Sequence, residues 1–182
     1  YAIAKIAGLK LCDAYNRQYG TNFITTMPTN LYGPNDNFDL ETSHVLPALL
    51  RKCHDAKTAQ AKEVVVWGSG TPRREFLHAD DLADACVFLM QNCSASELDG
   101  HVNIGTGVDV SIRELTHLIQ KTVDYKGALA FDASKPDGTP RKLLNVDKMN
   151  KLGWTAKKTL EKGLEDTYDW YLANLNLSKD AS

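Results

Sequence analysis

Short apolar runs alternate with longer segments of helical period along most of the 182 residues. Residues 63–67 carry three successive valines, as a strand does, whereas residues 82–91 repeat apolar side chains at helical spacing. An alternation of strands with helices is typical of proteins in which helices cover a sheet. The sequence therefore predicts the α/β class.

Capping and turn residues predict where the elements begin and end. A capping box at residues 111–114 opens one helix, and Gly20 closes the first one. The predicted helices are residues 1–19, 43–59 with Ser43 as the cap, 82–91 after the cap Asp80-Asp81, 111–124 and 159–175. The predicted strands are residues 22–27, 63–67, 75–78, 102–104 and 128–131. Residues 29–42 and 135–144 are expected to form loops, and residues 178–182 a frayed tail.

Charge and composition exclude several classes of partner. The chain has 21 Lys and Arg against 23 Asp and Glu, a net charge of -2, so it lacks a broad basic field that could hold a phosphate backbone. We therefore expect no nucleic-acid partner. The longest apolar stretches are far shorter than the roughly 20 residues that span a bilayer, so we expect no membrane partner. The four cysteines show no metal-like spacing, which favours a reducing, cytoplasmic location and no bound metal ion.

Tyr1 and Lys5 stand four residues apart in the first predicted helix, so both side chains lie on one face. An ammonium beside a phenol favours the phenolate and lowers the pKa of the phenol. Such a phenol can serve as the general acid for a carbonyl oxygen that receives a hydride. Taken alone, the spacing is explained better by an ordinary surface pair.

Several motifs occur in an order that points to one family. Residues 28–34 follow a predicted strand, and residues 67–70 and 73–81 come later in the chain. In this order and spacing the chain resembles the extended short-chain dehydrogenase/reductases that act on nucleotide sugars, and within them it is most similar to the GDP-L-fucose synthase family. The motifs that carry the closer resemblance are Tyr1-Ala2-Ile3-Ala4-Lys5, Met27-Pro28-Thr29-Asn30-Leu31-Tyr32-Gly33-Pro34, Ser43-His44-Val45 and Lys135-Pro136-Asp137-Gly138-Thr139-Pro140-Arg141-Lys142.

This resemblance implies a fold and an activity. The fold would be the carboxy-terminal part of a doubly wound, Rossmann-type parallel sheet with a smaller α/β lobe that binds the substrate. Residues 1–32 and 79–107 would belong to the NADP-binding domain, residues 33–78 and 108–175 to the substrate lobe, and residues 176–182 to a tail. The complete enzyme would be a homodimer that epimerises GDP-4-keto-6-deoxy-D-mannose at C3 and C5 and reduces C4 with NADPH, giving GDP-L-fucose.

The resemblance also assigns roles near the cofactor. Tyr1 would donate the proton in the reduction at C4, and Lys5 would lower its pKa and hold the nicotinamide ribose. His44 would border the cofactor and reprotonate the sugar carbanion during epimerisation; without the family it is more simply a solvated histidine at a helix end. The segment that lines the nicotinamide would be Pro28, Thr29, Asn30 and Leu31.

A second group of residues would bind the nucleotide sugar. Arg74 would contact the diphosphate, and Arg73 beside it is expected to be a surface cation. Trp67 would line the nucleotide pocket, with core packing as the alternative for this residue. Lys52 stands where relatives are expected to carry an Arg, so it keeps the charge but loses the bidentate guanidinium contact. The remaining members of the group are Asp137, Arg141 and Lys142.

Parts of such an enzyme are not found in the sequence. The chain begins at Tyr1 inside a helical pattern, which we interpret as the sign of a missing amino-terminal part. The glycine-rich phosphate turn and the family's catalytic cysteine and serine would lie there, so we expect the chain to be inactive alone. Gly105-Thr106-Gly107 lacks the third glycine of such a turn and is expected to connect the two lobes.

Two alternative functions remain open. The first is another nucleotide-sugar enzyme of the same fold, such as a 4-epimerase or a 4,6-dehydratase. The second is a non-catalytic module that binds a nucleotide sugar. Analysis of the reaction product distinguishes the first alternative from the activity that the resemblance implies. An upstream sequence without the glycine-rich turn would favour the second alternative.

Overall fold

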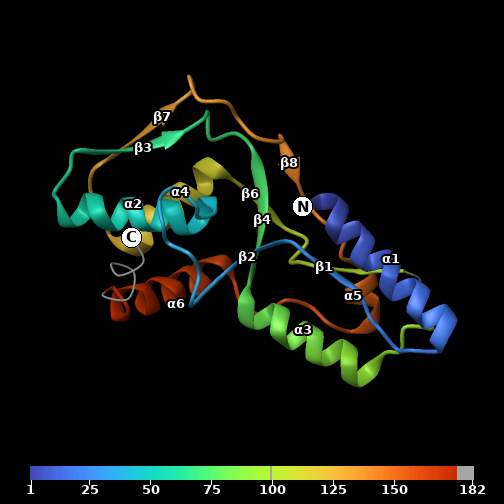
Figure 1. Cartoon of the computed structure of the whole chain (residues 1–182). Coiled ribbons are helices and arrows are strands. Elements are labelled where there is room, and N and C mark those ends of the chain that lie inside the picture. Colours follow the sequence, from blue (N-terminus) through green and yellow to red (C-terminus); the bar gives the residue numbers. More distant parts are fainter. Residues whose placement is uncertain (99, 176–182) are drawn as a thin grey trace.

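The computed structural model describes residues 1–98 and 100–175, so the predicted tail at 178–182 lies outside the described residues. The molecule is elongated, and β4 (Arg73–His78) runs through its middle (Figure 1). The helices on one side of β4 are α2 (Val45–Thr58), α4 (Ile112–Val123) and α6 (Leu160–Ala173). Those on the other side are α1 (Ala2–Tyr19), α3 (Ala79–Asn92) and α5 (Asp147–Leu152).

Most strand pairs are parallel, as expected where helices connect successive strands. The parallel pairs are β1 (Thr26–Pro28) with β5 (Val102–Ile104), β2 (Asn30–Tyr32) with β4, β3 (Glu63–Trp67) with β7 (Ala128–Asp132), and β8 (Arg141–Lys142) with β4. β6 (Asp109–Ser111) pairs with β4 in the antiparallel direction. The predicted α/β class is therefore confirmed.

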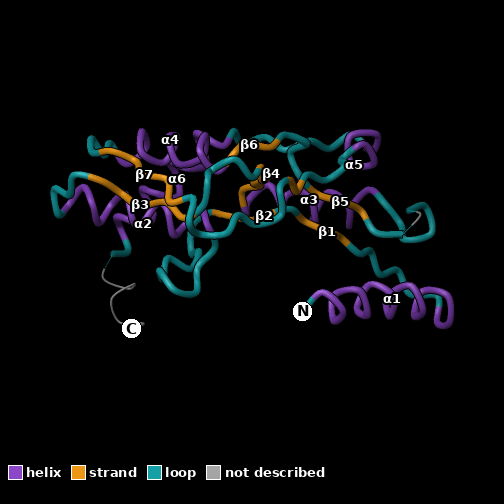
Figure 2. Tube along the Cα trace, turned by 90° about the horizontal axis from the view of Figure 1, so that it is seen from above, coloured by secondary structure: helices purple, strands orange, loops and turns teal. Residues whose placement is uncertain are grey.

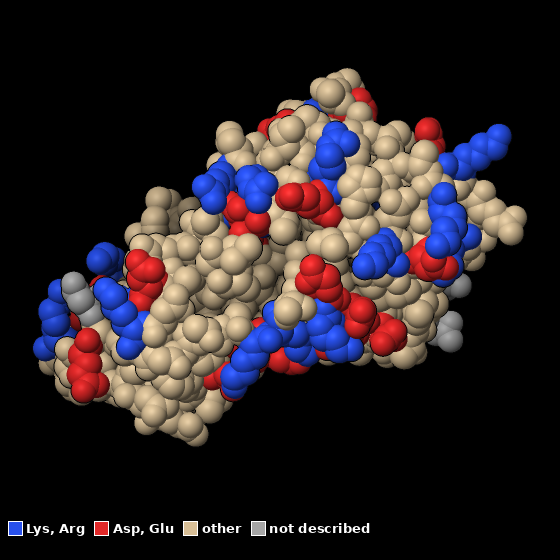
Figure 3. All heavy atoms as spheres, turned by 180° about the vertical axis from the view of Figure 1, so that it is seen from behind, with Lys and Arg blue, Asp and Glu red and all other residues tan. Residues whose placement is uncertain are grey.

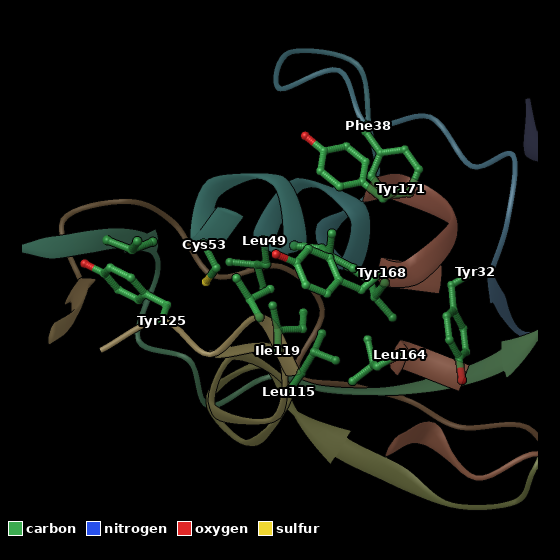
Figure 4. Packing of buried hydrophobic residues seen from close by; sticks show 14 of the residues in the cluster. Tyr32, Phe38, Leu49, Cys53, Leu115, Ile119, Tyr125, Leu164, Tyr168 and Tyr171 are labelled. Carbon is green, nitrogen blue, oxygen red and sulfur yellow. The ribbon is translucent and has the colours of Figure 1, made fainter. Parts of the chain in front are cut away.

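The larger hydrophobic cluster lies where α2, α4 and α6 meet (Figure 4). Leu115, Ile119 and Val123 follow one face of α4 at four-residue spacing, and all three are fully buried. Leu164 and Tyr168 approach them from α6. Full burial of one such side chain contributes about 1.5–3 kcal/mol, so this packed face fixes the position of α4 between its neighbours.

The smaller cluster covers β5. Leu89 from α3 is buried with Val102 and Ile104 from β5, and with Met149 and Trp154. Met149 belongs to α5, a short helix that the sequence pattern did not predict. The implied domain division placed residues 147–152 in the substrate lobe, whereas their packing partners lie on β5. The division of the chain into two domains stays a prediction.

Helix α1 stands apart from both clusters. It ends at Gly20 as predicted, and this glycine adopts a left-handed conformation with φ of 63°. Figure 2 shows the helix beside the rest of the molecule and joined to it through one end. No residue of α1 is buried, and Ile3 and Leu11 expose 78% and 58% of their surface. Its own hydrogen bonds, rather than a packed face, therefore hold this helix.

Several predicted boundaries are wrong near β1. The strand begins at Thr26 rather than at residue 22, because the Asn16 side chain takes both backbone groups of Phe23: it accepts from the amide and donates to the carbonyl, each at 2.9 Å. Those groups are then not available to a strand ladder. β2 lies inside the predicted loop 29–42, since its residues pair with β4. The short strands β6 and β8 were not predicted either.

Two predicted helix caps are also wrong. No side chain caps α2, whose N-cap position is held by His44 instead of Ser43. α3 begins earlier than predicted and is capped by His78, whose Nδ1 accepts from the amide of Asp80 at 3.2 Å. Asp80 therefore lies in the first turn of the helix rather than at its cap. The predicted capping box between Ser111 and Glu114 is confirmed.

The surface carries charges of both signs. On the face shown in Figure 3, basic and acidic side chains are interspersed over most elements. Across residues 1–98 and 100–175, no helix has both the length and the apolar character that a bilayer crossing requires.

The buried His78 predicts a stability that depends on pH. Its side chain is 1% exposed, and burial, followed by the charge of Lys158, lowers its pKa below the usual 6.5. In the unfolded chain this histidine has a pKa of about 6.5. As the pH falls, the unfolded chain therefore takes up the proton before the folded state does. The free energy of unfolding should therefore be greatest above this pH and decrease as the pH falls through it.

The substitution His78→Asn tests this prediction, because Asn can accept the same amide hydrogen bond but does not titrate. The variant should show a smaller loss of unfolding free energy than the wild type between about pH 7 and pH 5. Urea unfolding at a series of pH values gives both curves. His117→Asn, on an exposed position of α4, is the matched control and should keep the wild-type slope. Equal slopes in His78→Asn and wild type contradict the prediction.

Candidate functional site

The predicted pair of Tyr1 and Lys5 is formed at the start of α1. The Lys5 ammonium lies over the Tyr1 ring, 5.2 Å from its centroid. Tyr1 is 96% exposed and Lys5 is also exposed, so a phenol oxygen and an ammonium are both open to a ligand. The helix itself builds this pair, because side chains one turn apart share a face.

The segment from Pro28 to Leu31 joins β1 to β2 and is tied to the neighbouring strands. The Thr29 amide donates to the carbonyl of Ile104 at 3.0 Å. The Thr29 hydroxyl and the Asn30 side-chain amide both donate to the carbonyl of Glu75, at 3.2 and 2.8 Å. β4 and β5 therefore fix the segment that the family resemblance assigns to the nicotinamide.

His44 is exposed at the N-terminal end of α2. It lies near Asp36, whose pKa is raised by burial, while a hydrogen bond from the Asn37 amide and the charge of His44 act in the opposite direction. One oxygen of Asp36, Oδ2, is buried without a hydrogen-bond partner among the described residues. The loop before α2 thus holds an acidic group close to the imidazole.

Trp67 lies at the end of β3 and presents its indole to solvent. The side chain is 68% exposed, so the core-packing alternative does not apply. The ammonium of Lys52, on α2, lies 5.1 Å from the ring centroid, and the ammonium of Lys135 lies 5.8 Å from it. Two cations from different parts of the chain therefore meet at one exposed aromatic ring.

Asp137 lies against the turn that follows β3 and Trp67. Its carboxylate accepts from the Ser69 amide at 2.9 Å and from the Ser69 hydroxyl at 2.6 Å. Gly68 has φ of 88°, and a Cβ at this position would clash with the Asp137 carboxylate. The glycine thus allows the Asp137 loop to approach the turn after Trp67.

Four cationic side chains lie where β8 pairs with β4. Two of them are paired with an acid of the protein, and two are not paired within residues 1–98 and 100–175. Arg73 and Arg141 both bind the buried Asp109, with Nε–O distances of 2.9 and 2.5 Å. These contacts hold the pKa of Asp109 below its usual range, that with Arg141 first and that with Arg73 second. Arg73 lies at the surface with 41% of its side chain exposed, but its charge is paired with Asp109, and the same acid holds Arg141.

Arg74 and Lys142 are the other two cations. They are register partners across the β4–β8 pair, so their side chains start from neighbouring positions. Arg74 Nη1 donates to the carbonyl of Arg73 at 2.7 Å, and no ion pair of Arg74 or Lys142 occurs within residues 1–98 and 100–175. Both charges therefore remain for an anionic ligand.

Two groups of site residues are distinguished in the described part of the chain. One group is the pair Tyr1 and Lys5 on α1. The other group comprises Lys52, Trp67 and Asp137 at the end of β3, followed by Arg74 and Lys142 on β4 and β8. No hydrogen bond, ion pair or ring contact among the described residues joins Tyr1 or Lys5 to His44 or to Arg74. The structure thus supports the grouping of the predicted substrate ligands, whereas their catalytic and binding roles stay proposals.

The turn Gly105-Thr106-Gly107 does not resemble a phosphate site. The amides of Thr106 and Gly107 both donate to Oε1 of Glu75, at 2.6 and 2.7 Å. A carboxylate of the protein already occupies the position that a phosphate oxygen would take. The family resemblance assigns Lys5, beside Tyr1, to the nicotinamide cofactor, and the hydroxyl of Tyr1 and the ammonium of Lys5 are exposed together.

Two residues of the site were missed in the sequence. Lys135 begins the predicted loop 135–144, and nothing local shows that it reaches Trp67. Glu75 is the first residue of a predicted strand, yet it is fully buried and binds amides far away in the sequence. A carboxylate directly before the apolar pair Phe76-Leu77 is the signal that the sequence offers.

Comparison with known proteins gives matches along nearly the whole chain. Residues 1–105 match the model described as "NAD dependent epimerase/dehydratase family". The chain is 61% identical over 175 residues to GDP-L-fucose synthase 1 of Arabidopsis thaliana, covering 96% of this chain and 53% of that protein. It is 57% identical over 180 residues to GDP-L-fucose synthase of Escherichia coli (strain K12), covering 96% of this chain and 56% of that protein. The chain spans about half the length of the curated relatives it matches.

The fold matches that of solved enzymes as well. The structure of a GDP-L-fucose synthetase from Naegleria fowleri bound to NADP superimposes with a TM-score of 0.90 at 30% identity. The match covers 98% of this chain and 57% of that one. Together with the family match to residues 1–105, it confirms the predicted Rossmann-type α/β class.

Proposed function

Because the chain belongs to the NAD dependent epimerase/dehydratase family, we propose that the whole protein is a GDP-L-fucose synthase. It would epimerise GDP-4-keto-6-deoxy-D-mannose at C3 and C5 and then reduce C4 with NADPH. The observation that carries the proposal is the exposed Trp67 ring with two ammonium groups over it, in a chain that is 61% identical to a GDP-L-fucose synthase.

The binding groups suit a nucleoside diphosphate sugar. An exposed indole face can stack on a base or on a sugar ring. Around it, Lys52 and Lys135 supply positive charge, and Arg74 and Lys142 supply more along β4 and β8. Guanidinium and ammonium groups neutralise diphosphate oxygens, and the planar guanidinium can do so through two hydrogen bonds. Neutral sugars would leave this charge without a partner.

The first chemical step would move protons at carbon. The ketone at C4 acidifies the hydrogens on C3 and C5, so a base can remove one of them, and an acid can return a proton to the other face of the ring. His44 is the proposed acid, because imidazole titrates near neutral pH and the side chain is exposed at the helix end. The acidic group of Asp36 lies nearby.

The second step would place a proton on the oxygen at C4. NADPH, when bound, supplies the hydride. Tyr1 would donate its hydroxyl proton to that oxygen, and the Lys5 ammonium over the ring would stabilise the phenolate left behind. Lys5 would also bind the nicotinamide ribose, and the segment Pro28 to Leu31 would line the ring.

Tyr1→Phe and His44→Gln test the two roles in the whole protein. Tyr1→Phe should lower the rate of NADPH oxidation by about 10²- to 10⁴-fold, the range for a lost general acid, and should spare the exchange of solvent deuterium into C3 and C5. His44→Gln should lower the deuterium exchange and spare the reduction of an epimerised substrate. Mass spectrometry of the sugar and absorbance of NADPH give the two rates. Wild-type-like turnover in both variants contradicts the assignments.

The product identifies the reaction. Formation of GDP-L-fucose from GDP-4-keto-6-deoxy-D-mannose, with oxidation of one equivalent of NADPH, supports the proposed function. Interconversion of UDP-sugars without net loss of NADPH would instead indicate a 4-epimerase.

Lys135 is proposed as a further ligand of the diphosphate. Lys135→Gln in the whole protein should weaken the binding of GDP by roughly threefold to tenfold, which corresponds to about 1 kcal/mol. Calorimetric titration with GDP measures this. Lys10→Gln is the matched control, because Lys10 is an exposed lysine on α1 that pairs with Asp13. Equal affinities in Lys135→Gln and the control would remove Lys135 from the site.

We also propose that the whole protein is a homodimer in the cytoplasm. Exposed apolar side chains on α1, such as Ile3 and Leu11, favour burial of this helix against another surface. The four free cysteines suit a reducing compartment. Light scattering of the whole protein should give twice the mass of one subunit, and a monomer mass contradicts the dimer.

A further inference from the structure

Glu75 is a fully buried carboxylate at the centre of the molecule. Its Oε1 accepts from the amides of Thr106 and Gly107 at 2.6 and 2.7 Å, and its Oε2 accepts from the amide of Leu144 at 3.0 Å. Within residues 1–98 and 100–175 it forms no ion pair. The hydrogen-bond partners of this carboxylate are therefore three backbone amides and, at 3.4 Å, the Thr106 hydroxyl.

The backbone of Glu75 holds a further segment. Its carbonyl accepts from the Thr29 hydroxyl and from the Asn30 side-chain amide, at 3.2 and 2.8 Å. One residue of β4 thus binds three separate stretches of chain: residues 29–30, the turn 105–107, and Leu144. The first lies in the proposed cofactor segment, and Leu144 follows β8 by two residues.

A carboxylate is a costly residue to keep at this position. Removing it from water without hydrogen bonds costs several kcal/mol, so such groups are found where their bonds are complete. An apolar residue would fill a strand position in the core at lower cost. The turn is also adapted to the acid, because a Cβ on Gly105 would clash with Oε1 of Glu75. What the acid adds to simple packing is a defined position for the amides that it binds.

One of those amides, that of Leu144, belongs to the segment that carries Lys142, a proposed ligand of the diphosphate. Glu75 follows Arg74 in β4, and the Leu144 amide anchors the end of the β8 segment. Arg74 and Lys142 are register partners across these two strands. A carboxylate that fixes Leu144 to β4 therefore fixes where Lys142 lies relative to Arg74.

We propose that Glu75 is a positioning residue that sets the separation of Arg74 and Lys142 for the diphosphate of a nucleotide sugar. The inference rests on the proposed function for the identity of the sugar, but its test on GDP binding does not. Glu75 acts through the Leu144 amide and does not itself touch the ligand.

The substitution Glu75→Gln is chosen to break one hydrogen bond, the one from the Leu144 amide. If the Gln oxygen keeps the amides of Thr106 and Gly107, its NH₂ group faces the Leu144 amide, and two donors then oppose each other. The β8 segment should shift while the side-chain volume stays nearly constant. We expect the Kd for GDP to rise about tenfold, and the KM for the GDP-sugar to rise with it while kcat changes less.

Asp81→Asn is the matched control. Asp81 is also a buried carboxylate whose two oxygens accept backbone amides, those of Lys157 and Lys158 at 3.3 and 3.0 Å. The substitution creates the same opposition of donors away from β8. A purely structural loss lowers stability and the amount of active protein, so it lowers kcat but leaves Kd and KM unchanged. We expect that behaviour of Asp81→Asn and not of Glu75→Gln.

Gly105→Ala provides a second route to the same effect, and it serves if Glu75→Gln does not fold. Its added Cβ pushes on Oε1 of Glu75 without changing any charge. Gly105→Ala should also weaken GDP binding, and in the double variant the two losses should be less than additive, because they disturb one unit.

The outcomes separate this inference from the proposed function. Wild-type protein that binds GDP but does not turn over the 4-keto sugar overturns the function, and the Kd comparison still decides the role of Glu75. A GDP Kd in Glu75→Gln or in Gly105→Ala that matches Asp81→Asn overturns the positioning role. Weaker GDP binding in those variants, beyond that of Asp81→Asn, supports it.

Discussion

Strand β4 connects the two cores of the molecule through alternate side chains. Phe76 packs into the larger cluster and Leu77 into the smaller one, because successive side chains of a strand point to opposite faces. Glu75 precedes them and binds amides from other segments. A shift of β4 by one residue in one direction would place Glu75 at the core position of Phe76, and a shift in the other direction would place Phe76 where the acid now lies. The register of this strand is therefore strongly determined.

The distribution of charge around β4 explains how a chain of net charge -2 presents a cationic site. Asp109 neutralises Arg73 and Arg141, and Glu75 is satisfied by amides and takes no cation. Asp137, the acid within the site, accepts from the Ser69 amide and hydroxyl. Lys52 and Lys135 remain over Trp67, where an exposed aromatic ring holds cations without neutralising them. Local pairing, and not the overall charge, decides what the site can bind.

Local patterns predicted the parts of this structure that local interactions form. The apolar face and capping box of α4, the valines of β3 and the close of α1 at Gly20 each show in a few neighbouring residues. The pairing of Tyr1 with Lys5 is of the same kind. β2 and the His78 cap depend on partners distant in sequence or on an uncommon cap residue, so the pattern could not show them. The cluster around Trp67 needed the family resemblance for the same reason, and Lys135 and Glu75 were missed even so.

The proposed proton donor and the proposed substrate ligands are built in different ways. The i, i+4 geometry of α1 brings Lys5 over Tyr1 although no residue of this helix is buried. In proteins, most of the stability of a helix comes from packing of its apolar face, so contacts on the exposed apolar face of α1 must decide where it lies relative to β4. The geometry of the Tyr1 and Lys5 pair is therefore a property of the helix, whereas its proposed use on a sugar bound at Arg74 and Lys142 depends on how that face is covered.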